Sequence, residues 1–388
     1  MNATNHDRTG RSTRADSAAL STALVATALY VTAVAAALGL SALLVMVADG
    51  SPAEVLRAMW DGAFGSRQAI GNTMVAATPF GIVAIGAVVA NRAGLFNIGQ
   101  EGQLTIGAAL AIWAGISFPG PGPIKLLVAL LAGFIGGALW ASVASVAKYR
   151  FSVNEVIATL LLNFVAFQVV TYALDREFLL KPVFDAALPP QSGSLSPDAR
   201  LPSIEPLTSI PAHSGILLML FLVAVVAFVF ARTAWGRRID LLGHSPLLAR
   251  RAGVRPARTG SMALAIAGGA AGLAGAVILT GAVFRVDPGF SNNVGWTGLL
   301  VALVARDRPL VVAPVALAFG AIEAGGNLLA ATGVPRSTAD VVQALVVLAT
   351  VLPPVVLELR ARRLATTAAV KAERVASVAS LTVAREPL

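Results

Sequence analysis

The chain has 388 residues, of which 56% are hydrophobic and only 13% are charged, and its formal net charge is +9. A soluble domain is usually about 25% charged, so this composition indicates a polytopic membrane protein. The basic residues are spread between apolar stretches, which argues against nucleic-acid binding, and the absence of cysteine excludes disulfides, thiolate metal sites and cysteine nucleophiles.

Ten apolar stretches are predicted to span the membrane. The first follows a polar N-terminal tail, 1–20, and is too long for the core of a signal peptide. Each span is expected to be an α-helix, because lipid offers the backbone no hydrogen-bond partners. The predicted spans are 22–48, 69–90, 103–118, 125–147, 154–173, 214–232, 259–281, 294–305, 309–331 and 340–357. The third and the eighth are short for a bilayer that requires about 20 residues.

Lysine and arginine predict which loops face the cytoplasm. The stretch 233–258 is rich in arginine and holds one acid, Asp240, so it is expected to be cytoplasmic. The basic tail 359–388 is expected on the same side. The loop 174–213 leans acidic, is rich in proline and serine, and fits the outer face. Two cytoplasmic termini require an even number of spans, and ten spans in a transmembrane domain over 21–358 satisfy every loop.

Residues 91–107, NRAGLFNIGQEGQLTIG, interrupt the apolar sequence between the second and third predicted spans. Polar side chains at membrane depth are costly unless they face protein or a watery cavity. Two interpretations are open: a solvated cytoplasmic turn, or an unwound stretch that lines a translocation path. The polar residues that would line the path are Asn97, Gln100, Glu101 and Gln103. Glu101 could instead cap the next span, where an acid complements the helix dipole.

A second copy of part of this segment lies later in the chain. Asn97–Gly102 and Asn293–Gly298 share the pattern Asn-aliphatic-Gly-x-x-Gly, and each precedes a short predicted span. The predicted topology places them on opposite sides of the membrane, as an inverted repeat requires. Spans two to five and seven to ten are therefore predicted to be inverted repeat halves. Asn293 and Trp296 would contribute to the path, with the indole as a stacking face for a base.

Further polar residues fall within predicted spans. Asn163 lies in the fifth span, and Glu323 and Asn327 lie four residues apart on one face of the ninth. Polar and ionisable groups inside a membrane are functional candidates. The alternative for Glu323 is a structural hydrogen bond or ion pair within the helix bundle.

Two small-residue patterns have a structural interpretation. The sequences Gly133-x-x-x-Gly137 and Gly268-x-x-x-Gly272 are predicted to be packing seams that let two helices approach closely.

The segment 236–258, GRRIDLLGHSPLLARRAGVRPAR, is basic and carries several leucines, and its Ser-Pro pair predicts the start of a short helix. One interpretation is an amphipathic helix on the anionic inner leaflet. The other is a coupling helix that docks into a cytoplasmic ATPase. The residues predicted to receive the ATPase are Asp240, Leu241, Gly243, His244, Ser245, Leu248, Ala249, Arg250 and Gly253.

Several enzymatic motifs are absent. The chain has no G-x-x-x-x-G-K-[ST] motif, so it has no P-loop to cradle ATP phosphates. It also lacks H-E-x-x-H, and its three histidines are far apart in the sequence. The sequence therefore predicts neither an enzyme nor a metal site.

Four blocks resemble the permease subunits of ABC importers for nucleosides and simple sugars, in the superfamily that also contains ribose-type and branched-chain amino acid permeases. The blocks are 91–107, 154–163, 236–254 and 289–309. His244 stands where this family usually has asparagine, and Ala305 stands where it usually has glycine.

The resemblance implies an all-α ABC importer permease that carries nucleosides, or a ribose-type sugar or branched-chain amino acid, by alternating access. It implies a separate ATPase chain that binds ATP and Mg²⁺, so that this chain has no cofactor of its own. It implies a second permease subunit, either related or identical, and an extracellular substrate-binding lipoprotein. The expected location is a bacterial plasma membrane, in contact with its lipids, with both termini cytoplasmic.

Two other function classes remain open from the residues alone. An ion-coupled secondary transporter would use the inverted repeat, with Glu101 or Glu323 as its proton site, and would work without ATP. A membrane scaffold without transport activity would show no substrate effect.

Overall fold

The computed structural model describes residues 51–180 and 190–331, with isolated residues on either side. The chain divides into two compact units, and the larger one, Glu54–Arg336, is the unit described here. The predicted spans 22–48 and 340–357 and the tails 1–20 and 359–388 lie outside the described residues, apart from isolated positions.

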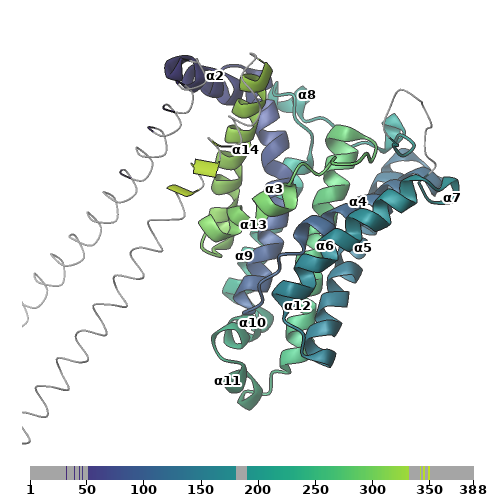
Figure 1. The fold of residues 1–388 in the computed structure, drawn as a ribbon, viewed down its shortest axis with the longest axis vertical. Helices are drawn as coiled ribbons and strands as arrows, with labels where there is room; N and C mark the ends of the chain where they lie inside the picture. The colour runs from purple at the N-terminus through teal and green to yellow at the C-terminus, as the bar shows by residue number, and fades with distance from the viewer. Residues whose placement is uncertain are drawn as a thin grey trace, which may run out of the picture. The chain divides into compact units, whose positions relative to one another are not determined.

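Regular structure in the described part of the chain is helical, apart from isolated bridge residues, among them the pair Ser203 and His213. In chain order the elements are α2 (Pro52–Phe64), α3 (Arg67–Arg92), α4 (Gln100–Ser117), α5 (Gly122–Phe151), α6 (Glu155–Leu174), α7 (Glu177–Leu180), η1 (Pro197–Ala199), α8 (Glu205–Thr208), α9 (Gly215–Arg232), α10 (Ala234–His244), α11 (Pro246–Arg251), α12 (Pro256–Ile278), η2 (Leu279–Val283), α13 (Val294–Val304) and α14 (Pro309–Ala331). Figure 1 shows α8 at one end of the long helices and α10 and α11 at the other.

Every span predicted between residues 69 and 331 coincides with a helix. Within the described residues, six helices are long and apolar enough to cross a membrane: α3, α5, α6, α9, α12 with η2, and α14. The other two predicted spans differ from this group. α4 begins at Gln100 rather than at 103, and its polar first turn lowers its hydropathy. α13 has only 11 residues, too few to cross a bilayer.

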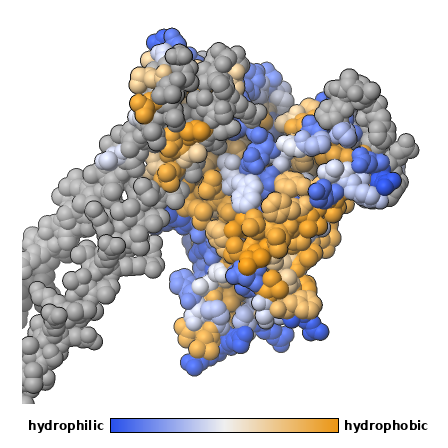
Figure 2. Space-filling model, viewed as in Figure 1, coloured by the Kyte–Doolittle hydropathy of each residue, from blue (hydrophilic) through white to orange (hydrophobic). Residues whose placement is uncertain are grey.

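α3 and α12 form the interior of the unit, whereas α5, α6 and α9 are largely exposed. The exposed faces of these outer helices are apolar, with residues such as Leu139, Phe164 and Phe221 more than half exposed. Figure 2 shows apolar side chains gathered over the middle of the visible face and hydrophilic ones near the end that carries α10 and α11. An apolar band between polar ends is the surface expected of a membrane-embedded bundle.

The two small-residue seams pack directly against each other and join α5 to α12. A Cβ on Gly268 would lie 2.5 Å from the carbonyl oxygen of Gly137, and a Cβ on Gly272 would overlap the carbonyl oxygen of Gly133. The two helix backbones therefore touch, and the prediction that these glycines form packing seams is confirmed.

Gly272→Ala is expected to destabilise the protein, because the new methyl group meets a rigid backbone oxygen rather than a movable side chain. Overpacking of this kind costs about 1–3 kcal/mol. The thermal unfolding midpoint of the purified protein in detergent measures the effect. Met262→Leu, on an exposed face of the same helix, is the control and should leave the midpoint unchanged. Equal midpoints for Gly272→Ala and the control would show that the seam tolerates a methyl group.

Candidate functional site

The first break in the bundle lies between α3 and α4. α3 ends in a Schellman motif, in which Gly94 has φ of +73° and donates its N–H to the Asn91 carbonyl at 2.9 Å, while Leu95 donates to the Ala90 carbonyl at 3.0 Å. The chain then runs without regular structure to Gly99, the N-cap of α4. Glycine fits at 94 because its φ is positive and because a Cβ there would lie 3.1 Å from the Gly243 Cα.

The polar residues around this break are buried. Asn97, Gln100 and Gln103 are each 1% exposed and Glu101 is 2% exposed. The interpretation of 91–107 as a solvated turn is therefore wrong for residues 97–103. Tertiary packing removes them from water, and their hydrogen bonds must come from protein or bound molecules.

Asn163 of α6 holds the break in place. Its amide nitrogen donates to the Ile98 carbonyl at 3.0 Å, and its amide oxygen accepts from the Gly102 N–H at 2.9 Å. Thr159, one turn earlier, accepts from the Ile98 N–H at 3.2 Å. These bonds replace the backbone partners that are lost where a helix is interrupted. Asn163 thus positions the predicted segment, with its amide engaged on the backbone.

Asn97 and Gln103 form a reciprocal amide pair inside the same break. Asn97 Nδ2 donates to Gln103 Oε1 at 2.8 Å, and Gln103 Nε2 donates to Asn97 Oδ1 at 3.0 Å. Gln100 differs: neither atom of its buried amide has a hydrogen-bond partner among the described residues. Of these three predicted path residues, Gln100 is therefore the one with unused hydrogen-bonding capacity.

The second break lies between α12 and α13. α12 ends in the π-helical turn η2, and irregular backbone follows, in which Phe284, Asn292 and Asn293 have positive φ. Asn293 and Trp296 are exposed beside this break. Glu323 of α14 accepts from Asn292 Nδ2 at 3.1 Å, so the structure brings Glu323 to the same loop.

Glu101 joins the two breaks. Its Oε2 accepts from the Gly295 N–H at 2.7 Å, and Gly295 lies in the first turn of α13. A Cβ on Gly295 would lie 2.5 Å from the Glu101 backbone nitrogen, so the two glycine motifs touch. A carboxylate near helix N-termini is favourable because it complements their dipoles. The capping alternative concerned α4, where Glu101 lies in the first turn, but the hydrogen bond that Glu101 makes is to the first turn of α13.

Asn327 lies apart from this group. It lines a separate cavity of about 390 Å³ between α2, α3 and α14. Its polar neighbours there are Asp61, Ser66, Gln68 and Asn72.

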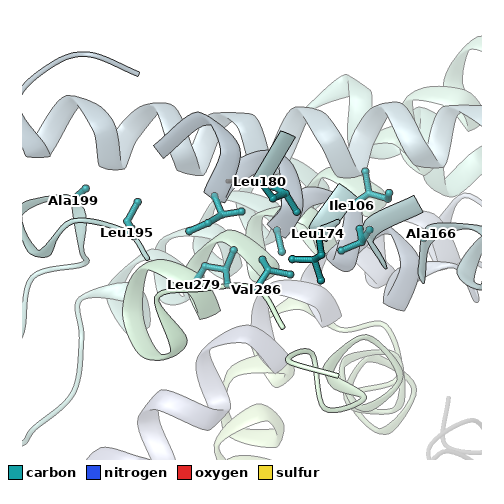
Figure 3. Packing of buried hydrophobic residues seen from close by; sticks show 11 residues of the cluster. Ile106, Ala166, Leu174, Leu180, Leu195, Ala199, Leu279 and Val286 are labelled. Carbon is teal, nitrogen blue, oxygen red and sulfur yellow. The ribbon is translucent and has the colours of Figure 1, made fainter. Parts of the chain in front are cut away.

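The loop 190–213, predicted to lie on the outer face, is bonded to the second break. Ser192 and Leu195 donate their N–H groups to the carbonyls of Val286 and Phe284 at 2.9 and 2.8 Å. Figure 3 shows Leu195 and Ala199 in one apolar cluster with Leu279 and Val286 and with residues of α4 and α6. The stretch 190–201, part of the loop 174–213 that is predicted to lie on the outer face, is packed onto the helix bundle.

His213 ends this outer loop. Burial lowers the pKa of the His213 imidazole to about 4, so the ring is neutral at pH 7. Its Nδ1 accepts from the Gly215 N–H at 3.1 Å, at the start of α9.

The predicted coupling segment forms α10 and α11. Ser245 caps α11 by accepting from the Leu248 N–H at 3.3 Å, and Pro246 is its first residue, as the sequence predicts. Gly253, with φ of +77°, ends α11 in a second Schellman motif. Leu248 is 53% exposed, and Leu247 beside it is 61% exposed.

The remaining predicted coupling residues divide by burial. Ala249 is buried, Asp240 and Leu241 are half-buried, and Gly243, His244 and Arg250 are exposed. The His244 ring lies 2.7 Å from the Asp240 carbonyl oxygen, within its own helix.

An ion pair fastens α10 to the end of α3. Arg92 Nε and Nη2 donate to the two Asp240 oxygens at 2.7 and 2.6 Å, and the Arg92 guanidinium lies 3.9 Å from the centre of the Phe230 ring. The neighbouring Asn91 donates to Asp307 at 2.8 Å, in the turn between α13 and α14. Burial raises the pKa of the Asp307 carboxyl. The end of α3 therefore contacts both the coupling segment and the element that follows the second break.

Over residues 51–180 and 190–331, no three His, Asp or Glu side chains gather in an arrangement that would bind a metal ion. The residues that the sequence failed to predict are Thr159, which bonds to Ile98, and Ser291, whose side chain is hydrogen-bonded to Glu101. Thr159 lies four residues before Asn163, and this spacing on a helix was the available signal.

Comparison with known proteins finds a family and several relatives for this chain. Residues 69–351 match the family described as "Branched-chain amino acid transport system / permease component". The guanosine ABC transporter permease protein NupP of Bacillus subtilis is 31% identical over 322 residues, which cover 81% of this chain and 90% of the relative.

Two other relatives match a similar share. A glucose ABC transporter permease protein of Haloferax volcanii is 29% identical over 81% of this chain and 84% of its own length. The nucleoside ABC transporter permease protein NupB of Lactococcus lactis is 26% identical over 79% of this chain and 86% of its own length.

Proposed function

The chain belongs to the family of branched-chain amino acid transport system permease components, and on this premise we propose that it imports nucleosides into the bacterial cytoplasm. It is a membrane transport subunit of an ABC importer and not an enzyme. Membership of this family argues against the two alternatives, an ion-coupled secondary transporter and a membrane scaffold without transport activity. The names of two relatives favour nucleosides, while the glucose permease keeps a sugar as the alternative substrate.

The proposed complex contains several chains. A cytoplasmic ATPase binds ATP and Mg²⁺, a second permease subunit completes the path, and an extracellular lipoprotein delivers the substrate. The end with α10 and α11 faces the cytoplasm, which fits its arginines. The loop 190–213 faces outward and, together with 284–293, receives the binding protein.

The meeting of the two breaks at Glu101 and Gly295 is the observation that carries this proposal. Discontinuous helices that meet inside a transporter commonly form its substrate path. The packing of the helices supports an inverted repeat. α12 packs against α5 and α4, and α3 packs in the corresponding way against α14 and α13. In this scheme α3 to α6 correspond to α12, α13, α14 and the predicted span 340–357.

The Arg92–Asp240 pair supports a route for the ATPase stroke. Movement of α11 and α10 would pull on the end of α3, two residues before Gly94. The break at 94–99 would move with the end of α3, because the break begins at Gly94. Glu101 would transmit the change to α13 through Gly295.

Labelled guanosine and ribose uptake test the proposal. Cells with the gene, cells without it, and cells whose partner ATPase is inactive are compared. We expect guanosine uptake to be lost in both mutant strains. Ribose uptake lost in their place would make a sugar the substrate, and guanosine uptake equal in all three strains would contradict a role in nucleoside import.

A further inference from the structure

A small cavity opens between the outer half of α6, α4 and the second break. Its volume is about 150 Å³. The residues that matter here are Thr105 of α4, Phe167 and Thr171 of α6, and Asp287, Phe290 and Ser291 of the loop before α13. This cavity is distinct from the buried contacts that join the two breaks, although Ser291 borders both.

Asp287 lines this cavity and carries an unused acceptor. Its Oδ1 is buried and has no hydrogen-bond partner among the described residues. An ionised carboxylate can only accept hydrogen bonds. Leaving such an atom buried without a donor is unfavourable, so a molecule that brings a donor would be stabilised there.

The three hydroxyl groups of the cavity already use their protons within the protein. Thr105 Oγ1 donates to the Glu101 carbonyl at 2.8 Å, and Thr171 Oγ1 donates to the Phe167 carbonyl at 2.8 Å. The Ser291 hydroxyl is hydrogen-bonded to the Glu101 carboxylate. Because a carboxylate only accepts, Ser291 is the donor, and each hydroxyl oxygen keeps only its acceptor capacity.

We infer that this cavity is a subsite for the sugar hydroxyls of the transported nucleoside. A cavity whose polar side chains offer acceptors favours a ligand rich in donors, and vicinal hydroxyls match the two oxygens of a carboxylate. It disfavours a carboxylate ligand, which would bring like charge to Asp287. The inference rests on the proposed nucleoside substrate and narrows recognition to the ribose.

Size and shape agree with a sugar rather than a whole nucleoside. Sites that enclose a drug-sized ligand usually measure about 300–1,000 Å³, so 150 Å³ suits one ring. Phe167 is 41% exposed at the cavity and Phe290 is half-buried, so an aromatic face is available to a base outside it.

Uptake of guanosine and of 2′,3′-dideoxyguanosine by Asp287→Asn tests the inference. Both are measured in cells that contain the complete transporter. The result is the rate of guanosine uptake divided by the rate of 2′,3′-dideoxyguanosine uptake. The binding protein is the same in every strain, so a changed ratio belongs to the permease. A hydrogen bond to a charged group is worth a factor of about ten or more, so we expect the ratio to fall about tenfold.

Two further variants complete the design. Thr171→Val removes one acceptor from the exposed side of α6. It should lower the ratio less than Asp287→Asn does. Because Thr171 is exposed, this variant keeps the test valid if Asp287→Asn fails to reach the membrane. Asp61→Asn, the same exchange on the exposed face of α2, should leave the ratio at the wild-type value.

The outcomes separate the two proposals. Normal wild-type guanosine uptake with an unchanged ratio in Asp287→Asn and Thr171→Val overturns the subsite alone. Guanosine uptake that does not depend on the wild-type gene overturns the nucleoside substrate, and the subsite with it.

Discussion

Replacing Asn163 with leucine is expected to abolish transport by destabilising the first break. Leucine is branched at the same carbon but leaves the Ile98 carbonyl and the Gly102 N–H without their side-chain partner. Each unsatisfied buried group costs about 1–3 kcal/mol. The sum is a large part of the 5–15 kcal/mol that typically separates folded from unfolded protein.

The amount of protein in the membrane and its thermal unfolding midpoint measure this effect. Gln168→Leu is the matched control, because it makes a similar change at an exposed position of the same helix. Asn163→Asp keeps the acceptor for Gly102 but loses the donor to Ile98, and it should fall between wild type and Asn163→Leu. A wild-type midpoint in Asn163→Leu would mean that the break is held by other contacts.

Asp240→Lys is expected to abolish substrate uptake while substrate capture by the binding protein stays intact. The new ammonium group faces the Arg92 guanidinium in a partly buried site, where both partners of the present pair are only about a quarter exposed. Removal of one partner from such a pair leaves the other charge uncompensated. α10 then loses the ion pair that fastens it to the end of α3.

Uptake and ATP hydrolysis by the assembled transporter are the two readouts. ATP hydrolysis that continues without uptake would place the fault in coupling rather than in folding. Arg238→Glu reverses a charge on an exposed face of α10 and should leave uptake near normal. The exchange Arg92→Asp with Asp240→Arg should restore part of the uptake, although it loses the contact with Phe230. Full uptake by Asp240→Lys alone would remove the pair from the coupling route.

The helices, the glycine seams and the existence of a break were predictable from the sequence, because hydropathy and glycine spacing are local signals. The start of α4 could not be predicted in this way. Gln100, Glu101 and Gln103 have the composition of a loop, and only tertiary burial makes them helical. The role of Glu101 was open for a similar reason, since its partner Gly295 lies 194 residues away along the chain.

The outer loop illustrates a second limit. Its composition predicted only that it lies on the outer face, and no periodic pattern marks the apolar positions, such as Leu195, that pack inward. Its backbone is ordered by bonds to carbonyls of residues 280–286. Such pairing depends on which segments meet in space and not on the residue types of either one.

The contact between α5 and α12 bears on how the protein moves. Where side chains separate two helices, rotamer changes can absorb a sliding motion. At Gly133, Gly137, Gly268 and Gly272 there are no side chains to rearrange, and the backbones are in direct contact. The two helices should therefore behave as one rigid body. Relative motion then falls to the parts held by side-chain hydrogen bonds: α6 through Asn163 and Thr159, and α13 through Glu101.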